Sequence, residues 1–139
     1  MTTYRKLLEG LQLRFFSPDE VLSYADVVRN GVRNSLPPRS QWPNIIPTLW
    51  VMDHLRFVLG QPVTLTSIYR NEDYNREVGG ASRSQHKENR AIDFQVRNVS
   101  PRRAANSLIK LRDSGMFKGG VGVYRTFVHV DTRGRNATW

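Results

Sequence analysis

The chain contains no cysteine, which excludes a disulfide framework and a zinc ribbon built on thiolates. It has only three histidines, so a metal site would have to combine imidazoles with carboxylates. No run of about 20 apolar residues is present to span a bilayer. The segment from Met1 to Lys6 is followed by an acidic residue, Glu9, and lacks the apolar stretch of a signal peptide. We therefore expect no membrane insertion and no signal-directed export.

The 139 residues, 39% of them hydrophobic and 10% aromatic, suffice for one hydrophobic core, and we expect a single domain over 1–139. The net charge of +9 indicates an anionic partner or a solubilising surface. Its sign alone does not distinguish nucleic acid from an acidic polymer such as a bacterial wall. The basic residues are dispersed rather than gathered in an arm that would bind nucleic acid.

Local signals predict three main helices after a short amphipathic segment over 4–13. The run Ser17-Pro18-Asp19-Glu20 forms a capping box and predicts a helix over 18–29 that ends near Asn30-Gly31. Residues 47–59 are apolar on more than one face, which predicts a central buried helix. A third helix begins after Ser100-Pro101 and stops at Ser114-Gly115.

Alternating patterns predict strands over 62–67, 91–96 and 121–130, with a short helix or turn over 71–78. On the last strand, Val123, Arg125, Phe127, His129 and Asp131 should share one face. Asp93 should face away from the apolar side of its strand. The order of elements predicts an α+β fold with a small, mainly antiparallel sheet and helices packed on one face.

Two segments carry residues suited to a metal. His86 and Asp93 lie seven positions apart, and His129 lies in a second segment near the C-terminus. Two imidazoles and a carboxylate suit a zinc ion that leaves one position for water, although this spacing alone is a weak pattern. The third histidine, His54, has no companion ligand at helical spacing, and we interpret it as an ordinary helix residue beside Asp53.

Several ordered motifs make the prediction more specific. These are Ser67-Ile68-Tyr69-Arg70, Tyr74-Asn75 with Val78-Gly79-Gly80-Ala81, and Ser84-Gln85-His86 through Ala91-Ile92-Asp93-Phe94. Together they resemble the M15 metallopeptidases, the zinc D-alanyl-D-alanine carboxypeptidases and related phage endolysins. The segments Gly120 to Tyr124 and Phe127 to Gly134, with Trp139 and the opening Phe16 to Glu20, resemble subfamily A. The similarity spans about residues 60–139.

The resemblance implies a hedgehog/DD-peptidase type of fold in which His86, Asp93 and His129 bind Zn²⁺. It implies that Arg70 binds a substrate carboxylate or stabilises the oxyanion, a task that suits a guanidinium. The alternative for Arg70 is a surface ion pair with Glu72 or Asp73. Ser84 and Gln85 would contact the substrate or support the site, and the alternative for them is ordinary loop hydrogen bonding.

The chain departs from the family pattern at three positions. Asn89 and Ile68 replace glycines, in S-x-H-x-x-G-x-A-x-D and S-G-Y-R respectively. Asparagine tolerates a left-handed backbone, and Ile68 either narrows the cleft or packs beneath it. Thr126 stands where many members have a carboxylate. We therefore take Asp131 as general base, with an orienting role or a pair with Arg133 as its alternative and Glu88 in reserve.

We expect a peptidase that hydrolyses a bond in peptidoglycan stem peptides or cross-links, as a D,D-carboxypeptidase, an endopeptidase or an endolysin. It would be a monomer, present in the cytoplasm of the host cell and acting at the wall after release, or associated with a virion. One alternative is a non-catalytic, zinc-containing module that binds the wall or builds the virion. The other, specific nucleic-acid binding, rests on charge alone, and we do not expect it.

Overall fold

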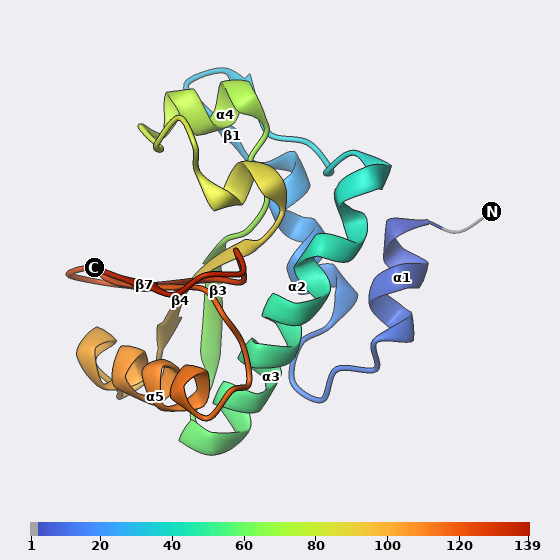
Figure 1. The fold of residues 1–139 in the computed structure, drawn as a ribbon. Helices are drawn as coiled ribbons and strands as arrows, with labels where there is room; N and C mark the ends of the chain where they lie inside the picture. The colour runs from blue at the N-terminus through green and yellow to red at the C-terminus, as the bar shows by residue number, and fades with distance from the viewer. Residues whose placement is uncertain (1–2) are drawn as a thin grey trace.

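A five-stranded sheet forms the centre of the protein in a computed structural model that describes residues 3–139 (Figure 1). The start of the segment considered for a signal peptide, Met1 and Thr2, lies outside the described residues. The strands follow the order β3 (Val63–Ser67), β4 (Ala91–Val96), β6 (Val128–Asp131), β5 (Gly120–Val123) and β7 (Ala137–Thr138). Every neighbouring pair is antiparallel except β5 and β7. The predicted α+β fold is confirmed.

Two long helices supply the apolar layer against the sheet. These are α3 (Ile46–Leu59), which follows the 3-10 helix η2 (Arg39–Ile45), and α5 (Pro101–Asp113). Fully buried side chains of α3, α5 and β4 form one core that includes Leu49, Met52, Leu55, Ile92, Phe94 and Leu108. The remaining short helices are α1 (Tyr4–Gly10), α2 (Pro18–Leu22), α4 (Glu72–Glu77) and the 3-10 helix η3 (Gln85–Glu88). In Figure 1, α1 lies beyond α3 and α4 lies across the sheet from α5.

The predicted helix signals are present where the sequence places them. The Ser17 hydroxyl accepts the Glu20 N–H at 3.3 Å, and the Glu20 carboxylate accepts the Ser17 N–H at 3.1 Å. Gly60 ends α3 in the left-handed conformation, with φ 63°. Ser100 caps α5. None of the helices in residues 3–139 combines the length and the apolar character that a membrane crossing requires.

The predicted helix over 18–29 is wrong in its second half. The α-helix ends at Leu22, and a 3-10 turn, η1 (Ser23–Asp26), leads into a hairpin of β1 (Val28–Arg29) and β2 (Val32–Arg33). Asn30 and Gly31 adopt φ of 50° and 79°. Two successive left-handed residues form the tight turn that matches the twist of a hairpin, so Asn30-Gly31 joins two strands instead of ending a helix.

Two further expectations need correction. The predicted strand over 121–130 is the hairpin of β5 and β6, turned at 124–127, where the Tyr124 N–H donates to the Phe127 carbonyl at 3.0 Å. The shared face predicted for this strand therefore does not extend through Arg125, although His129 and Asp131 remain neighbours on one face. Helix α3 is buried on one side only, because Trp50 and Phe57 are 52% and 59% exposed.

Candidate active site

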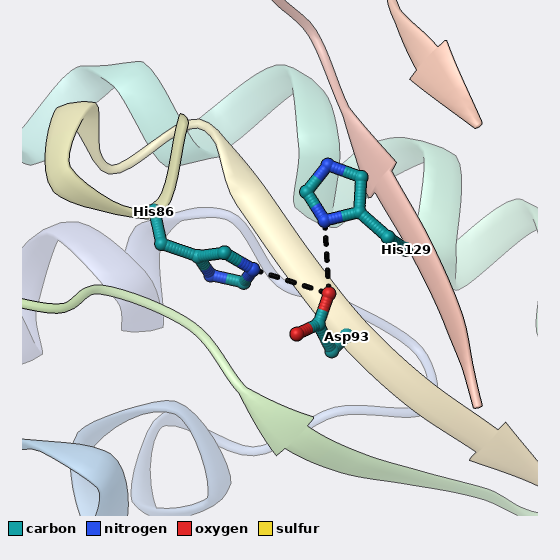
Figure 2. Close-up of side chains that lie close together, drawn as sticks. All are labelled: His86, Asp93 and His129. Carbon is teal, nitrogen blue, oxygen red and sulfur yellow. Dashed lines mark hydrogen bonds and ion pairs between the residues drawn. The ribbon is translucent and has the colours of Figure 1, made fainter. Parts of the chain in front are cut away.

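Three side chains from three elements meet at one point (Figure 2). They lie on the face of the sheet opposite α3 and α5, because Asp93 alternates on β4 with Ile92 and Phe94, which are buried in the core with these helices. His86 comes from η3, Asp93 from β4 and His129 from β6, and all three are buried. Antiparallel pairing places Asp93 directly beside His129. The Asp93 Oδ1 atom lies 3.1 Å from His86 Nε2 and 2.9 Å from His129 Nδ1. The structure thus brings the predicted ligand set together.

Hydrogen bonds on the far side of each imidazole determine which nitrogen faces the centre. His86 Nδ1 lies 2.5 Å from the Ile68 carbonyl, which can only accept, so this nitrogen donates. His129 Nε2 lies 2.8 Å from Asp131 Oδ2 and donates in the same way. His86 Nε2 then directs a lone pair inward, and it is buried with no hydrogen-bond partner. A nitrogen lone pair without a donor, directed at a carboxylate, is what a bound cation would require. A hydrogen-bond partner on the other ring nitrogen is usual for metal-binding histidines.

Electrostatics also favour a cation at the centre. Burial lowers the pKa of His86, which keeps this imidazole neutral as a ligand must be. Burial opposes the charged form of Asp93, but the two imidazoles outweigh it and hold its pKa well below the usual range. For His129, burial lowers the pKa, and hydrogen bonds to Asp131 and Asp93 outweigh it and raise the pKa. A metal ion would replace a proton on this ring.

Arg70 follows β3 and is held at the edge of the same site. Its Nε donates to Ser67 Oγ at 3.0 Å, Nη1 to Asn75 Oδ1 at 3.3 Å and Nη2 to Asp93 Oδ2 at 3.3 Å. Burial lowers the pKa of Arg70 and the Asp93 charge opposes this, so the guanidinium remains charged. The alternative surface pairs are absent for Arg70 in residues 3–139, because Glu72 and Asp73 pair with Arg76 and Lys87.

Asp131 lies behind His129 and is fully buried. Its Oδ1 accepts from the N–H groups of Gly120 and Arg133 and from Arg133 Nε, and its Oδ2 accepts from Arg133 Nη2 and His129. Burial would raise the pKa of Asp131, but the bonds from Arg133, His129 and Gly120 outweigh it and hold the pKa well below its usual range. Both oxygens are therefore engaged by fixed donors.

A cleft of about 500 Å³ opens over the three side chains. One wall is formed by residues 78–85, which include Ser84 and Gln85, and the other by Tyr124, Phe127, Arg133 and Trp139. Ser84 also caps η3, because its hydroxyl accepts the His86 N–H at 3.2 Å. Among the cleft-lining side chains of residues 3–139, Asp93 is the only carboxylate, and Glu88 is exposed away from the cleft.

The structure shows how Asn89 and Ile68 are accommodated where the family pattern has glycine. Asn89 adopts φ 57° and ψ 39°, the left-handed conformation expected for it, and ends η3. Its buried amide donates to the Gln41 carbonyl at 3.0 Å. Ile68 packs in the core below the site, so it does not narrow the cleft. His54 is exposed on α3 near Phe57, in agreement with its interpretation as an ordinary helix residue.

Two residues of the site had no role assigned from sequence, although both lie in the quoted motifs. Asn75 is buried, and while its Oδ1 accepts from Arg70, its Nδ2 donates to the Ala81 carbonyl at 3.0 Å. It therefore joins Arg70 to the cleft wall. The Trp139 ring lies 5.2 Å from the His129 ring, and a Cβ at Gly122 would come within 2.5 Å of its Nε1. A glycine at 122 thus makes room for this indole.

Comparisons with known proteins agree with this site. Residues 14–131 match the family model described as Peptidase M15. The peptidoglycan L,D-endopeptidase MepK of Escherichia coli K12 is 38% identical over 79 residues, which cover 52% of this chain and 41% of that protein. MepK of Shigella flexneri matches to the same extent, and the chain thus spans about two-fifths of the length of these relatives. Because the family match covers most of the chain and all three candidate ligands, the protein belongs to the peptidase M15 family.

Proposed function

We propose that the protein is a zinc-dependent peptidase that hydrolyses a peptide bond in the stem peptides or cross-links of bacterial peptidoglycan. The observation that carries this proposal is the convergence of His86 Nε2, Asp93 Oδ1 and His129 Nδ1 in a cleft, with His86 Nε2 buried without a hydrogen-bond partner. Membership of the M15 family supports peptidase chemistry, and the similarity to the peptidoglycan endopeptidase MepK supports peptidoglycan as the substrate.

The donor set suits zinc, because two neutral imidazoles and one carboxylate leave a coordination position free. When bound, zinc would supply a Lewis acid for the substrate carbonyl and a nucleophile at neutral pH. Ile68 and Asp131 would hold the two imidazoles in the required tautomers through the 2.5 Å and 2.8 Å contacts.

Arg70 would bind the oxygen that becomes negative, or a substrate carboxylate. A guanidinium carries five N–H donors, and three of its nitrogens each use one on Ser67, Asn75 and Asp93. Two donors therefore remain for the substrate at a position that is already fixed, which is what electrostatic stabilisation of a transition state requires. Ser84 and Gln85 would contact the peptide from the wall formed by residues 78–85.

We assign Asp131 the orienting role that was its alternative, in place of general base. Its side chain is fully buried and its two oxygens accept five hydrogen bonds, so no lone pair is directed at the cleft. The role that these contacts support is to keep the proton on His129 Nε2 and the lone pair on Nδ1.

The net charge of +9 supports a site of action on the anionic wall. We propose that the protein reaches the wall after release from the producing cell, or as part of a virion. A non-catalytic module that binds zinc and the wall is the second candidate, favoured because Asp93 is the single carboxylate that lines the cleft in the described part of the chain.

A mass spectrum of purified peptidoglycan fragments after incubation with the protein tests both candidates. The peptidase should release one defined peptide-bond product, which a zinc chelator abolishes and added zinc restores. His86→Ala should form no product, whereas His54→Ala, on the far side of α3, should match the wild type. A zinc-loaded protein without any product would refute the peptidase and leave the binding module.

A further inference from the structure

The face of the sheet that carries the His86–Asp93–His129 group has two adjoining hollows. A groove of about 380 Å³ adjoins the cleft and is lined by Arg29, Thr66, Ser67, Tyr74 and Gln95. It shares Arg70, Val78, Asp93 and Phe127 with the cleft. Because the same four side chains border both hollows, the groove continues the cleft past Arg70, on the side away from Ser84 and Gln85.

Strand pairing explains why the floor of this groove is polar. Leu65 and Phe94 are paired across β3 and β4, and both are buried in the core. Residues that alternate with them point to the opposite face, so Gln95 lies on the same side of β4 as Asp93. Thr66 and Gln95 are exposed there. An extended peptide laid across this face would meet hydrogen-bonding side chains rather than an apolar surface.

The charge of the groove is carried by an arginine that has no partner. Arg29 is exposed on the β1–β2 hairpin, and no carboxylate lies within ion-pair distance of it among residues 3–139. Neighbouring arginines differ in this respect, since Arg33 pairs with Asp26 and Arg76 pairs with Glu72 and Asp73. Asp93, the one carboxylate that lines the groove among residues 3–139, already faces Arg70. The far end of the groove is thus left with an unneutralised positive charge.

We propose that the Arg29–Thr66–Gln95 groove is a second substrate subsite, which receives a carboxylate-bearing residue of an acidic peptide, so that the bond over the three ligands is an internal one. This inference rests on the proposed peptidase function and specifies its substrate. A hydrolase of terminal bonds needs room for a chain on one side of its reacting group. Here the hollow continues from the cleft over the three ligands into a second, polar groove, whose outer part carries a cation.

The first arm of the test uses synthetic peptides built around each peptide bond of a peptidoglycan stem or cross-link in turn. One peptide is extended on both sides of the bond, and two others are truncated to the bond on one side or the other. The subsite predicts that kcat/KM for the doubly extended peptide exceeds that of both truncated peptides by about tenfold, as expected when remote contacts serve the reacting centre. Equal rates for a peptide truncated on one side would overturn the inference.

The second arm uses Arg29→Gln and two forms of the extended peptide, with its side carboxylate free or converted to the carboxamide. The variant should lower kcat/KM for the carboxylate form about three- to fivefold, the range of an exposed ion pair, and leave the carboxamide form unchanged. Arg102→Gln is the matched control, because Arg102 is exposed on α5 across the sheet. An equal effect on both forms, or no effect on either, would overturn the role of Arg29.

Calorimetric binding of the same peptides in the presence of a chelator separates the two proposals. If no peptide is cleaved but the carboxylate form still binds about three- to fivefold more weakly to Arg29→Gln, the subsite stands and the peptidase function fails. If peptides are cleaved but Arg29→Gln matches the wild type in both cleavage and binding, the peptidase function stands and the subsite fails.

Discussion

Asp131→Asn distinguishes an orienting residue from a general base. The substitution keeps the size of a side chain that is fully buried, and removes its charge. The amide group would be able to donate as well as accept, so the preference for a proton on His129 Nε2 would weaken. The bidentate contact with Arg133, at 2.9 Å and 2.7 Å, would lose its ionic character.

The magnitude follows from these contacts. Loss of a partner that orients a metal-binding histidine typically weakens metal affinity by about 10- to 100-fold, or about 1.4 to 2.7 kcal/mol. Arg133 remains partly exposed, with 19% of its side chain accessible, so water can replace part of the lost pair. We therefore expect the free energy of unfolding of the metal-free protein to fall by about 1 to 3 kcal/mol, which leaves it folded.

Zinc affinity is measured by competition with a chromophoric chelator, and kcat/KM is measured at saturating zinc. An orienting Asp131 predicts weaker zinc binding, with activity largely restored when zinc is in excess. A general base predicts the reverse, with zinc affinity unchanged and the rate reduced by about 10² to 10⁴ at any zinc concentration. Asp113→Asn, on an exposed carboxylate at the end of α5, should change neither quantity. Unchanged zinc affinity in Asp131→Asn would refute the orienting role.

Two other substitutions test the packing beside Arg70 and the effect of burying the Tyr4 phenol. In Gly80→Ala the new Cβ would lie 2.1 Å from Asn75 Oδ1 and 3.0 Å from Arg70 Nη1, so the Arg70 guanidinium would be displaced. We expect kcat/KM to fall by about tenfold or more while zinc affinity stays unchanged. A variant with wild-type kcat/KM would contradict this prediction. Burial raises the pKa of Tyr4 to about 12. The neutral phenol therefore stabilises the fold by about 2 to 3 kcal/mol below pH 10, and this contribution is lost as the pH rises through 12. The free energy of unfolding in urea, measured at pH 8 and above pH 11, should fall with pH less in Tyr4→Phe than in the wild type. An equal fall in both proteins would show that another group titrates.

The parts of the fold that sequence predicts are those governed by local chemistry. The Ser17 capping box, the Gly60 stop and the alternation over 91–96 each depend on a few adjacent residues, and each appears as expected. The hairpin at Asn30-Gly31 also has a local sequence signal, because two successive residues that accept positive φ are the strongest local indication of a hairpin. Our prediction takes this pair only as the end of the helix that begins at the capping box.

Other features depend on contacts that no local pattern contains. The turn at 124–127 has no glycine, proline, asparagine or aspartate, and the stacked rings of Tyr124 and Phe127, 4.4 Å apart, accompany it. The register that sets Asp93 beside His129 joins residues 36 positions apart. The ligand types could therefore be predicted from motifs, whereas the distances, the inward-facing nitrogens and the enclosure of Asp131 required the packed structure.

The position of Trp139 gives the site an optical reporter of its own. Its indole lies 5.2 Å from the His129 ring and 5.3 Å from the Arg133 guanidinium, so the charge held by these groups acts directly on its excited state. The other two tryptophans, Trp42 in η2 and Trp50 in α3, lie in different elements and do not line the cleft. With both replaced by phenylalanine, emission from the single remaining indole would follow occupancy of the centre in real time, without any added dye.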